Sequence, residues 1–351
     1  MNLKKWAFAL LFPVQLLLIH WISKNPEWVE AYYSQNIYPK IGMLLRSVFG
    51  VFPFSIGDIL YILLVINILA FIFKKVRKRK VSFWEVIRKA LTLTSVIYFI
   101  FHVFWGINYY RKPLHTILNI ENDYNTEQLE RVTLQLLEKS NNLHFQIETI
   151  DTLAVKVPYT TKEIFECTSE AYVGLQKVFP KLNYTPRSIK KSLLSVPLTY
   201  MGFSGYLNPF TNEAQVNRLI VPYKMLTTSC HEEAHQLGFA KENEANFIGV
   251  MACMNSDDLY FQYSGYTFAL RYCLHELYLR DYQKFICIKE KMHVGILKNY
   301  DESRAFWKEY DNPLEPIFKL FYGEFLKANN QSQGIKSYNY VVALFVNYFD
   351  E

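Results

Sequence analysis

At 351 residues, the chain is longer than one average domain, and we expect two parts. It is 51% hydrophobic and 17% aromatic, which is high for a soluble enzyme, and the apolar excess lies near the N-terminus. The formal net charge of +6 equals the charge of one run, Lys74–Lys80, which holds six basic residues and no acid. A short basic run between apolar stretches is typical of a cytoplasmic loop beside anionic headgroups, so we expect no nucleic-acid partner.

Three apolar stretches lie in the N-terminal third: Trp6 to Ile22, Ile56 to Phe73, and Ala90 to Ile107. Each is close to the ~20 residues that a helix needs to cross ~30 Å of hydrocarbon. The first is followed by Lys24-Asn25-Pro26, which is unlike a signal-peptide cleavage site, so we expect a retained anchor. The sequence therefore predicts a membrane domain at 1–110 with three transmembrane helices that contact the lipid bilayer.

The basic residues also predict the orientation of these helices. Lys4 and Lys5 precede the first stretch and the Lys74–Lys80 run follows the second, so both are expected on the cytoplasmic side. Three spans then place the chain after Asn108 on the periplasmic or extracellular side of a bacterial inner membrane. Aromatic residues at this outer end are expected to form an interfacial belt, namely Trp105, Tyr109 and Tyr110.

Residues 111–351 are predicted to form a second domain, because charges become frequent and hydrophobic runs shorten there. Apolar residues at helical spacing predict helices from Thr126 to about Lys139 and from Thr161 to Val178. Two or three short strands are predicted within Ser192–Val196, Leu198–Met201 and Glu213–Val221. After Pro222 the pattern is helical again. The expected fold class is α+β, with a helix-rich domain and a small sheet following the membrane helices.

The segment His231-Glu232-Glu233-Ala234-His235 matches the H-E-x-x-H pattern of zinc hydrolases. Residues four apart share one face of a helix, so both imidazoles can bind one ion, and Zn²⁺ accepts imidazole nitrogen. Glu232 follows the first histidine, where a carboxylate can act as general base toward a zinc-activated water. The pattern predicts Zn²⁺ as the cofactor, His231 and His235 as metal ligands, and Glu232 as the catalytic base.

Two acids are candidates for the third metal ligand. Gly238 is expected to end the motif helix, and a second helix then begins at Lys241 with Glu242 and Glu244 near its start. We prefer Glu242, because Asn246 lies four residues further along the same face and can support a ligating histidine. Glu244 remains the alternative third ligand. Either acid could instead be a solvated residue that the helix dipole favours at the start of a helix.

Other residues around the motif carry weaker predictions. An edge strand preceding the motif could bind an extended peptide, or the strands could only shield the helix. The five cysteines predict no disulfide framework, and Cys230 is interpreted as a small buried residue rather than a ligand or nucleophile. Four side chains could stabilise an oxyanion, and the sequence selects none of them: Tyr263, Tyr266, Arg271 and His275.

Three segments together resemble a bacterial membrane family of unknown function, numbered 3810: Trp105–Arg111, Ser204–Phe210 and Cys230–Phe247. The resemblance covers nearly the whole chain, including the three apolar stretches. It implies a zincin-like peptidase domain, with the two motif histidines in the metal pattern and the motif glutamate as base.

The segment Glu242–Asn246 is also similar to the glutamate helix of gluzincin peptidases, in which a ligand Glu precedes an acid or amide by four residues. This similarity favours Glu242 as the ligand. The chain departs from that group in the very short distance between His235 and the second helix, which keeps Glu244 under consideration.

The motif and its context predict a membrane-anchored zinc-dependent peptidase that hydrolyses an amide bond of a peptide or protein substrate at the cell envelope. The alternative is a catalytically inactive, zinc-stabilised binding or scaffold protein; the intact Glu232 argues against it, because a structural site needs no base. A third hypothesis is an assembly factor that senses envelope components, with an incidental metal. The sequence leaves the substrate, the cleavage preference and the oligomeric state open.

Overall fold

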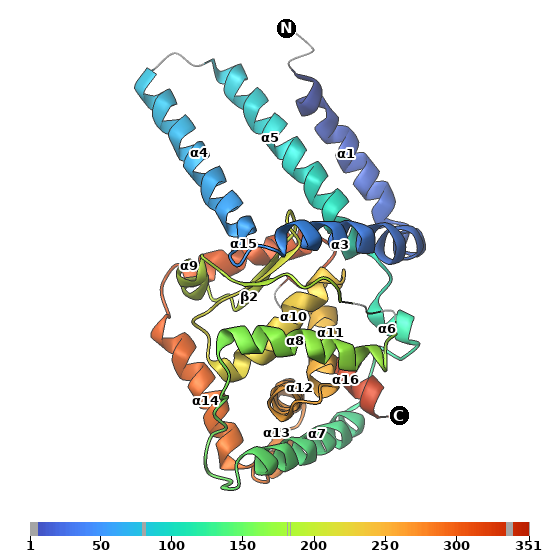
Figure 1. Ribbon diagram of the computed structural model, residues 1–351. Coiled ribbons are helices and arrows are strands. Elements are labelled where there is room, and N and C mark those ends of the chain that lie inside the picture. Colours follow the sequence, from blue (N-terminus) through green and yellow to red (C-terminus); the bar gives the residue numbers. More distant parts are fainter. Residues whose placement is uncertain (1–5, 79–81, 181, 183, 335–339, 351) are drawn as a thin grey trace.

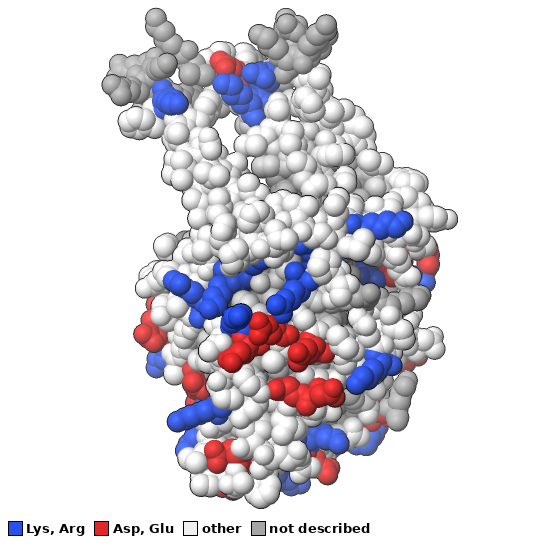
Figure 2. Space-filling model, in the orientation of Figure 1, with Lys and Arg blue, Asp and Glu red and all other residues white. Residues whose placement is uncertain are grey.

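The computed structural model describes residues 6–78, 82–180, 182, 184–334 and 340–350, and it is mostly helical (Figure 1). Three long helices project side by side from a helical body: α1 (Ala7–Ser23), α4 (Ile56–Lys78) and α5 (Phe83–Phe104). Figure 2 shows these helices almost free of charged side chains, except near their far ends. This distribution of charge suits helices that are surrounded by lipid.

Two of the projecting helices, α4 and α5, are each long and apolar enough to cross a membrane. The third candidate is a bent pair, in which α1 is followed after a break by Pro26–Phe49 at an angle of 90°. The described residues therefore hold two or three possible spans, as expected of a membrane protein. The basic run predicted to be a cytoplasmic loop falls partly outside the described residues.

The outer end of the third predicted span differs from the expectation. The helix begins at Phe83 rather than near Ala90, and it ends at Phe104 because a 3-10 turn, η3 (Gly106–Tyr110), follows. The predicted interfacial belt is wrong, since its three members are 6%, 1% and 9% exposed: Trp105, Tyr109 and Tyr110. They pack in one buried cluster with residues of α1 and the segment after it. Their rings join the projecting helices to the body instead of facing headgroups.

A membrane-proximal layer, defined here as residues 26–49 and 105–111, lies across the base of the projecting helices (Figure 1). It contains α2 (Pro26–Trp28), the π-helix η2 (Val29–Ile37), α3 (Tyr38–Phe49) and η3. The start of α4 is also held to the body, because the Asp58 carboxylate accepts from the Leu193 amide at 2.6 Å and from the Ser192 hydroxyl at 3.0 Å.

The body is built around α12 (Leu259–Arg280), which packs against α7, α10, α11 and α16. α7 (Thr126–Ile147) and α8 (Thr161–Gln176) begin with capping boxes formed by Asn125 and Thr160. α7 therefore has an Asn cap, and it continues past its predicted end at Lys139. The remaining helices of the body are α6 (Leu114–Leu118), α9 (Ser195–Tyr200), α10 (Pro222–Gln236), α11 (Glu242–Met254), α13 (Tyr282–Lys289), α14 (Val294–Glu309), α15 (Glu315–Ala328) and α16 (Val341–Phe349).

A small sheet precedes the motif helix, as predicted, and its strands are β1 (Ile189–Lys191), β2 (Gly205–Asn208) and β3 (Glu213–Val216). The order is β1-β3-β2, with β1 parallel and β2 antiparallel to β3, so β2 is an edge strand. Two strand predictions were wrong. Leu198–Met201 falls largely in α9. Ser192–Val196 follows β1 and ends inside α9, because the Ser195 hydroxyl donates to the Ser192 carbonyl and the helix begins at Ser195.

Candidate metal centre

The motif helix α10 begins and ends where the sequence predicted. Pro222 occupies its first turn, where the missing N–H costs nothing. Gly238 has a φ of +89°, and this left-handed residue turns the chain after the helix toward α11. Since α11 packs directly against α10, residues at its start reach the histidine face of α10.

Three donor atoms meet between these two helices. The Oε2 atom of Glu242 lies 3.3 Å from Nε2 of His231 and 3.5 Å from Nε2 of His235. The ring centroids of the two histidines are 4.6 Å apart, and the rings are nearly perpendicular. Together these residues form one group of donors within 4.8 Å of one another, and it could hold a metal ion.

The spacing of these atoms fits a tetrahedral metal ion. Ligands at ~2.0–2.1 Å from a tetrahedral zinc lie about 3.3–3.4 Å apart, which is close to both oxygen–nitrogen separations. Among the described residues, the buried Oε2 atom of Glu242 has no hydrogen-bond donor. A buried carboxylate oxygen normally has a partner, so a cation bound between the three atoms would remove this deficit.

The electrostatics of the group favour a cation as well. Burial opposes ionisation of Glu242, but the two imidazoles hold the pKa of this carboxyl well below its usual value. Burial likewise acts against a charge on His235, yet the neighbouring Glu242 carboxylate raises the pKa of His235 to about 9. The pKa of His231 is lowered, mainly by burial. The site thus stabilises one negative carboxylate beside a positive charge.

Two of the three donors are oriented by a hydrogen bond with a neighbour. Nδ1 of His235 lies 2.7 Å from the Phe239 carbonyl, so the tautomer with Nδ1–H leaves Nε2 free to face the group. The predicted support of His231 by Asn246 is not formed, because Nδ1 of His231 and Nδ2 of Asn246 are both buried without a hydrogen-bond partner among the described residues. The hydroxyl of Tyr322, on α15, donates to Oε1 of Glu242 at 2.6 Å. Sequence reasoning missed Tyr322, because nothing local distinguishes it from the chain's other tyrosines.

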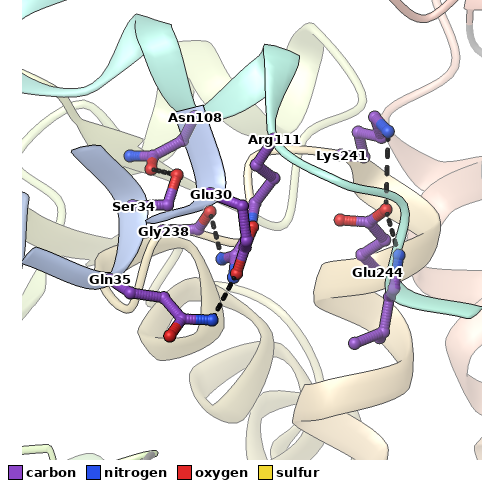
Figure 3. Close-up of polar contacts among 9 residues, drawn as sticks. Glu30, Ser34, Gln35, Asn108, Arg111, Gly238, Lys241 and Glu244 are labelled. Carbon is purple, nitrogen blue, oxygen red and sulfur yellow. Dashed lines mark hydrogen bonds and ion pairs between the residues drawn. The ribbon is translucent and has the colours of Figure 1, made fainter. Parts of the chain in front are cut away.

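The other candidate acid points away from the histidines. Oε1 of Glu244 accepts from the Leu114 amide at 3.0 Å and lies 3.5 Å from the Lys241 ammonium (Figure 3). Glu244 therefore fixes the segment that leads into α6. The structure brings Glu242, and not Glu244, together with the two histidines.

Glu232 is buried at the edge of the same group. Its carboxylate lies against Gly205 of β2, so the edge strand runs beside the motif. Burial raises the pKa of Glu232 to about 8. In the described part of the chain, its Oε2 atom has no hydrogen-bond partner. This carboxylate can therefore exchange a proton near neutral pH, which general acid–base chemistry requires.

The membrane-proximal layer covers the C-terminal end of α10. The Trp105 indole donates to the His235 carbonyl at 3.1 Å, and the Tyr38 hydroxyl donates to the Gln236 carbonyl at 2.9 Å. Arg111 donates to the Gly238 carbonyl at 3.1 Å and forms a two-bond ion pair with Glu30 (Figure 3). The carbonyls that a helix end leaves unpaired are thus satisfied by residues of this layer.

The oxyanion candidates separate into two groups. Arg271 and His275 line the cleft that contains the donor group. The Tyr263 hydroxyl instead donates to Asn299 in the core, and Tyr266 packs against the core without lining the cleft. Cys230 is fully buried with a raised thiol pKa caused by burial, as interpreted from the sequence, and all five cysteines are free.

Gly249 permits the close approach of α11 to α10. A Cβ atom at this position would lie 2.8 Å from the His231 amide nitrogen and 2.9 Å from its Cα. We predict that Gly249→Ala pushes the helices apart, lowers the free energy of unfolding by about 1–3 kcal/mol and weakens metal binding. Thermal unfolding and zinc titration of the purified full chain test this. Wild-type values for both quantities would contradict the packing argument.

The described residues define a mostly helical α+β protein in which two or three helices can cross a membrane. The model of the family described as Protein of unknown function (DUF3810) matches residues 33–346, and the chain belongs to this family. Searches of curated proteins and of solved structures find no match. These comparisons confirm the resemblance to the family of unknown function, and they give no support to a zincin-like or gluzincin peptidase.

Proposed function

We propose that the chain is a membrane-anchored, zinc-dependent amide hydrolase. The observation that carries the proposal is the convergence of Glu242 Oε2 with the Nε2 atoms of His231 and His235 at tetrahedral edge lengths. Among the described residues three protein donors meet there, which matches the three ligands and one open position of catalytic zinc sites. This count favours an enzyme over a zinc-stabilised scaffold, whose sites have four protein ligands.

A zinc ion in this site would supply Lewis-acid activation of a water molecule and of the scissile carbonyl. Glu232 would accept the proton of the attacking water and pass it to the leaving amine. Its burial against Gly205 places it between the motif helix and the edge strand β2. An extended peptide could pair with the free edge of β2 and so present its amide beside Glu232.

We further propose that α1, α4 and α5 all span the inner membrane, with the N-terminus in the cytoplasm and the metal centre on the periplasmic or extracellular side. The proposal depends on the basic residues Lys4 and Lys5 and the Lys74–Lys80 run. Alkaline phosphatase fused after Glu351 should be active in cells, since it folds only outside the cytoplasm. An inactive but expressed fusion would contradict this orientation.

Zinc content tests the metal centre directly. We predict about one zinc per purified full chain by mass spectrometry, and less than a tenth of that after His231→Ala or Glu242→Ala, because two ligands do not retain the ion. Glu244→Gln is the matched control in the same helical turn, and it should keep the zinc because Glu244 faces Leu114. Full zinc occupancy in both ligand variants would overturn the proposal.

A further inference from the structure

The cleft around the metal centre extends well beyond the donor group. Its volume is about 1490 Å³, and it is lined by residues from the projecting helices, the edge strand, and helices α10 to α15. This is larger than the ~300–1,000 Å³ of most small-ligand pockets. A cleft of this size can hold a substrate segment that continues on both sides of the reacting bond.

One end of the cleft lies at the base of the apolar helices. Tyr61 of α4 and Phe101 of α5 both line it, and both are within two turns of the helix end that meets the body. Tyr61 stacks on Tyr206 of β2 with ring centroids 6.1 Å apart, and Phe101 contacts Phe325 of α15 at 6.1 Å. Figure 1 shows α4 standing apart from the α1–α5 pair. The metal cleft therefore reaches the level at which the chain enters the bilayer.

The other end of the cleft is basic. Lys224 lies on the same face of α10 as His231, two turns away, or about 10 Å at ~1.5 Å per residue. The Lys224 ammonium lies 4.6 Å from the Phe268 ring centroid, and the Arg271 guanidinium lies 5.8 Å from the same centroid. No carboxylate of the described residues forms an ion pair with either group. An anion bound beside these two groups would offset the repulsion between their positive charges.

The other charged residues that line the cleft are also mainly positive. Besides the metal-centre residues Glu232 and Glu242, its described lining contains no acid. Of the further cations of the lining, Arg304 and Lys319 form ion pairs with Asp301 and Glu315, whereas Lys289 has no ion pair among the described residues. Burial and the nearby Arg271 hold the pKa of Lys224 well below its usual value, and a bound anion would reverse this shift. The cleft is complementary to a negatively charged segment on the side of the metal centre remote from the membrane.

We infer that the substrate is a segment of a membrane-anchored protein that enters the cleft from the bilayer and carries acidic residues which bind Lys224 and Arg271. This inference rests on the proposed function of the chain as an amide hydrolase. At ~3.3 Å per extended residue, the 10 Å between His231 and Lys224 corresponds to about three residues. The acidic side chain therefore lies about three residues beyond the cleaved amide, and the apolar anchor lies on the opposite side, toward Tyr61 and Phe101.

The test uses the full-length Glu232→Gln protein in phosphatidylcholine nanodiscs, with and without a chelator, so that binding is measured apart from hydrolysis. The probes are fluorescent peptides with an N-terminal dodecanoyl chain and three Asp or three Gln residues, and the same peptides without the acyl chain. We expect the acylated Asp peptide to bind at least about tenfold more tightly than the acylated Gln peptide, and more tightly than the acyl-free Asp peptide. The preference for Asp should weaken as salt rises.

Substitutions at the basic end of the cleft test whether Lys224 and Arg271 cause the preference for the Asp peptide. Lys224→Met and Arg271→Met should each remove most of the preference for Asp, whereas Lys224→Arg should keep it and so control for folding. Lys139→Gln, on an exposed part of α7 outside the cleft, is the matched control and should behave as the wild type.

Equal binding of the Asp and Gln peptides, or a preference unchanged by Lys224→Met and Arg271→Met, would overturn the acidic specificity. Equal binding of the acylated and acyl-free peptides would overturn entry from the bilayer. Peptide binding is also measured on the chelated protein, and this measurement needs neither zinc nor hydrolysis. An absence of zinc or of hydrolysis in the untreated protein would therefore refute only the proposed function. The binding preferences would then still decide the nature of the ligand.

Discussion

The Glu232→Gln protein is expected to keep one zinc per chain and to lose amide hydrolysis by about 10²–10⁴-fold. The substitution preserves the size of a buried side chain whose Oε2 atom has no described hydrogen-bond partner, so the local packing should persist. What it removes is the ability to take up and release a proton. Hydrolysis of internally quenched peptides and zinc content, measured on the same preparation, test both halves of the prediction.

The neighbouring Glu233 provides the control for that experiment. Glu233 is also fully buried, but it lies outside the cleft, and burial raises its pKa well above the usual value. Since burial disfavours the charged form of this carboxyl, replacement by an amide of the same size should be tolerated. Glu233→Gln is therefore expected to retain both zinc and hydrolysis. If Glu232→Gln were as active as the wild type, the general base would have to be sought elsewhere.

The second large effect is expected at the ion pair of Arg111 with Glu30. Both side chains are 7% exposed, and the guanidinium makes two bonds to the carboxylate, at 2.7 and 2.9 Å. Arg111→Met leaves Glu30 buried without its counter-ion and releases the Gly238 carbonyl, so we expect a loss of about 3–5 kcal/mol in the free energy of unfolding. Thermal unfolding of the full chain in detergent measures it.

A chemically similar pair on the surface is the control for this prediction. Arg131 makes the same two-bond contact with Asp350 at 2.7 and 2.9 Å, but its side chain is 57% exposed. Water screens such a pair, so Arg131→Met should barely change the unfolding temperature. Equal effects of the two substitutions would show that burial does not determine the cost of losing Arg111.

The local features of the candidate metal centre could be predicted from the sequence. The i, i+4 spacing of His231 and His235, the first-turn Pro222 and the left-handed Gly238 all follow from helix geometry, and the structure has each of these helix features. The choice of Glu242 over Glu244 depended on helical spacing as well, and Glu242 is the acid that lies with the histidines. Such features involve residues within a few turns of one another, where periodicity determines which side chains share a face.

The contacts between residues far apart in the chain could not be predicted from the sequence. Tyr322 bonds Glu242 from a helix 80 residues away, and Trp105 bonds His235 across 130 residues. No periodic pattern connects such positions, because their contact depends on how whole helices pack. The same limit explains the wrong interfacial belt: an aromatic cluster at the end of an apolar helix fits a headgroup layer and a buried junction equally well. Strand prediction failed at 198–201 for a local reason, since a short helix begins at Ser195 and continues to Tyr200.

The bonds from Trp105, Tyr38 and Arg111 to the end of α10 have a practical consequence for handling the protein. A fragment that begins at Arg111 would lack Tyr38 and Trp105, and the carbonyls of His235 and Gln236 would lose these donors. If the protein binds zinc as proposed, any treatment that disturbs the packing of the N-terminal helices on the body, such as a harsh detergent, should therefore weaken zinc binding. Retained zinc would then report whether an extracted preparation still has its anchor and body correctly docked, before any substrate is known.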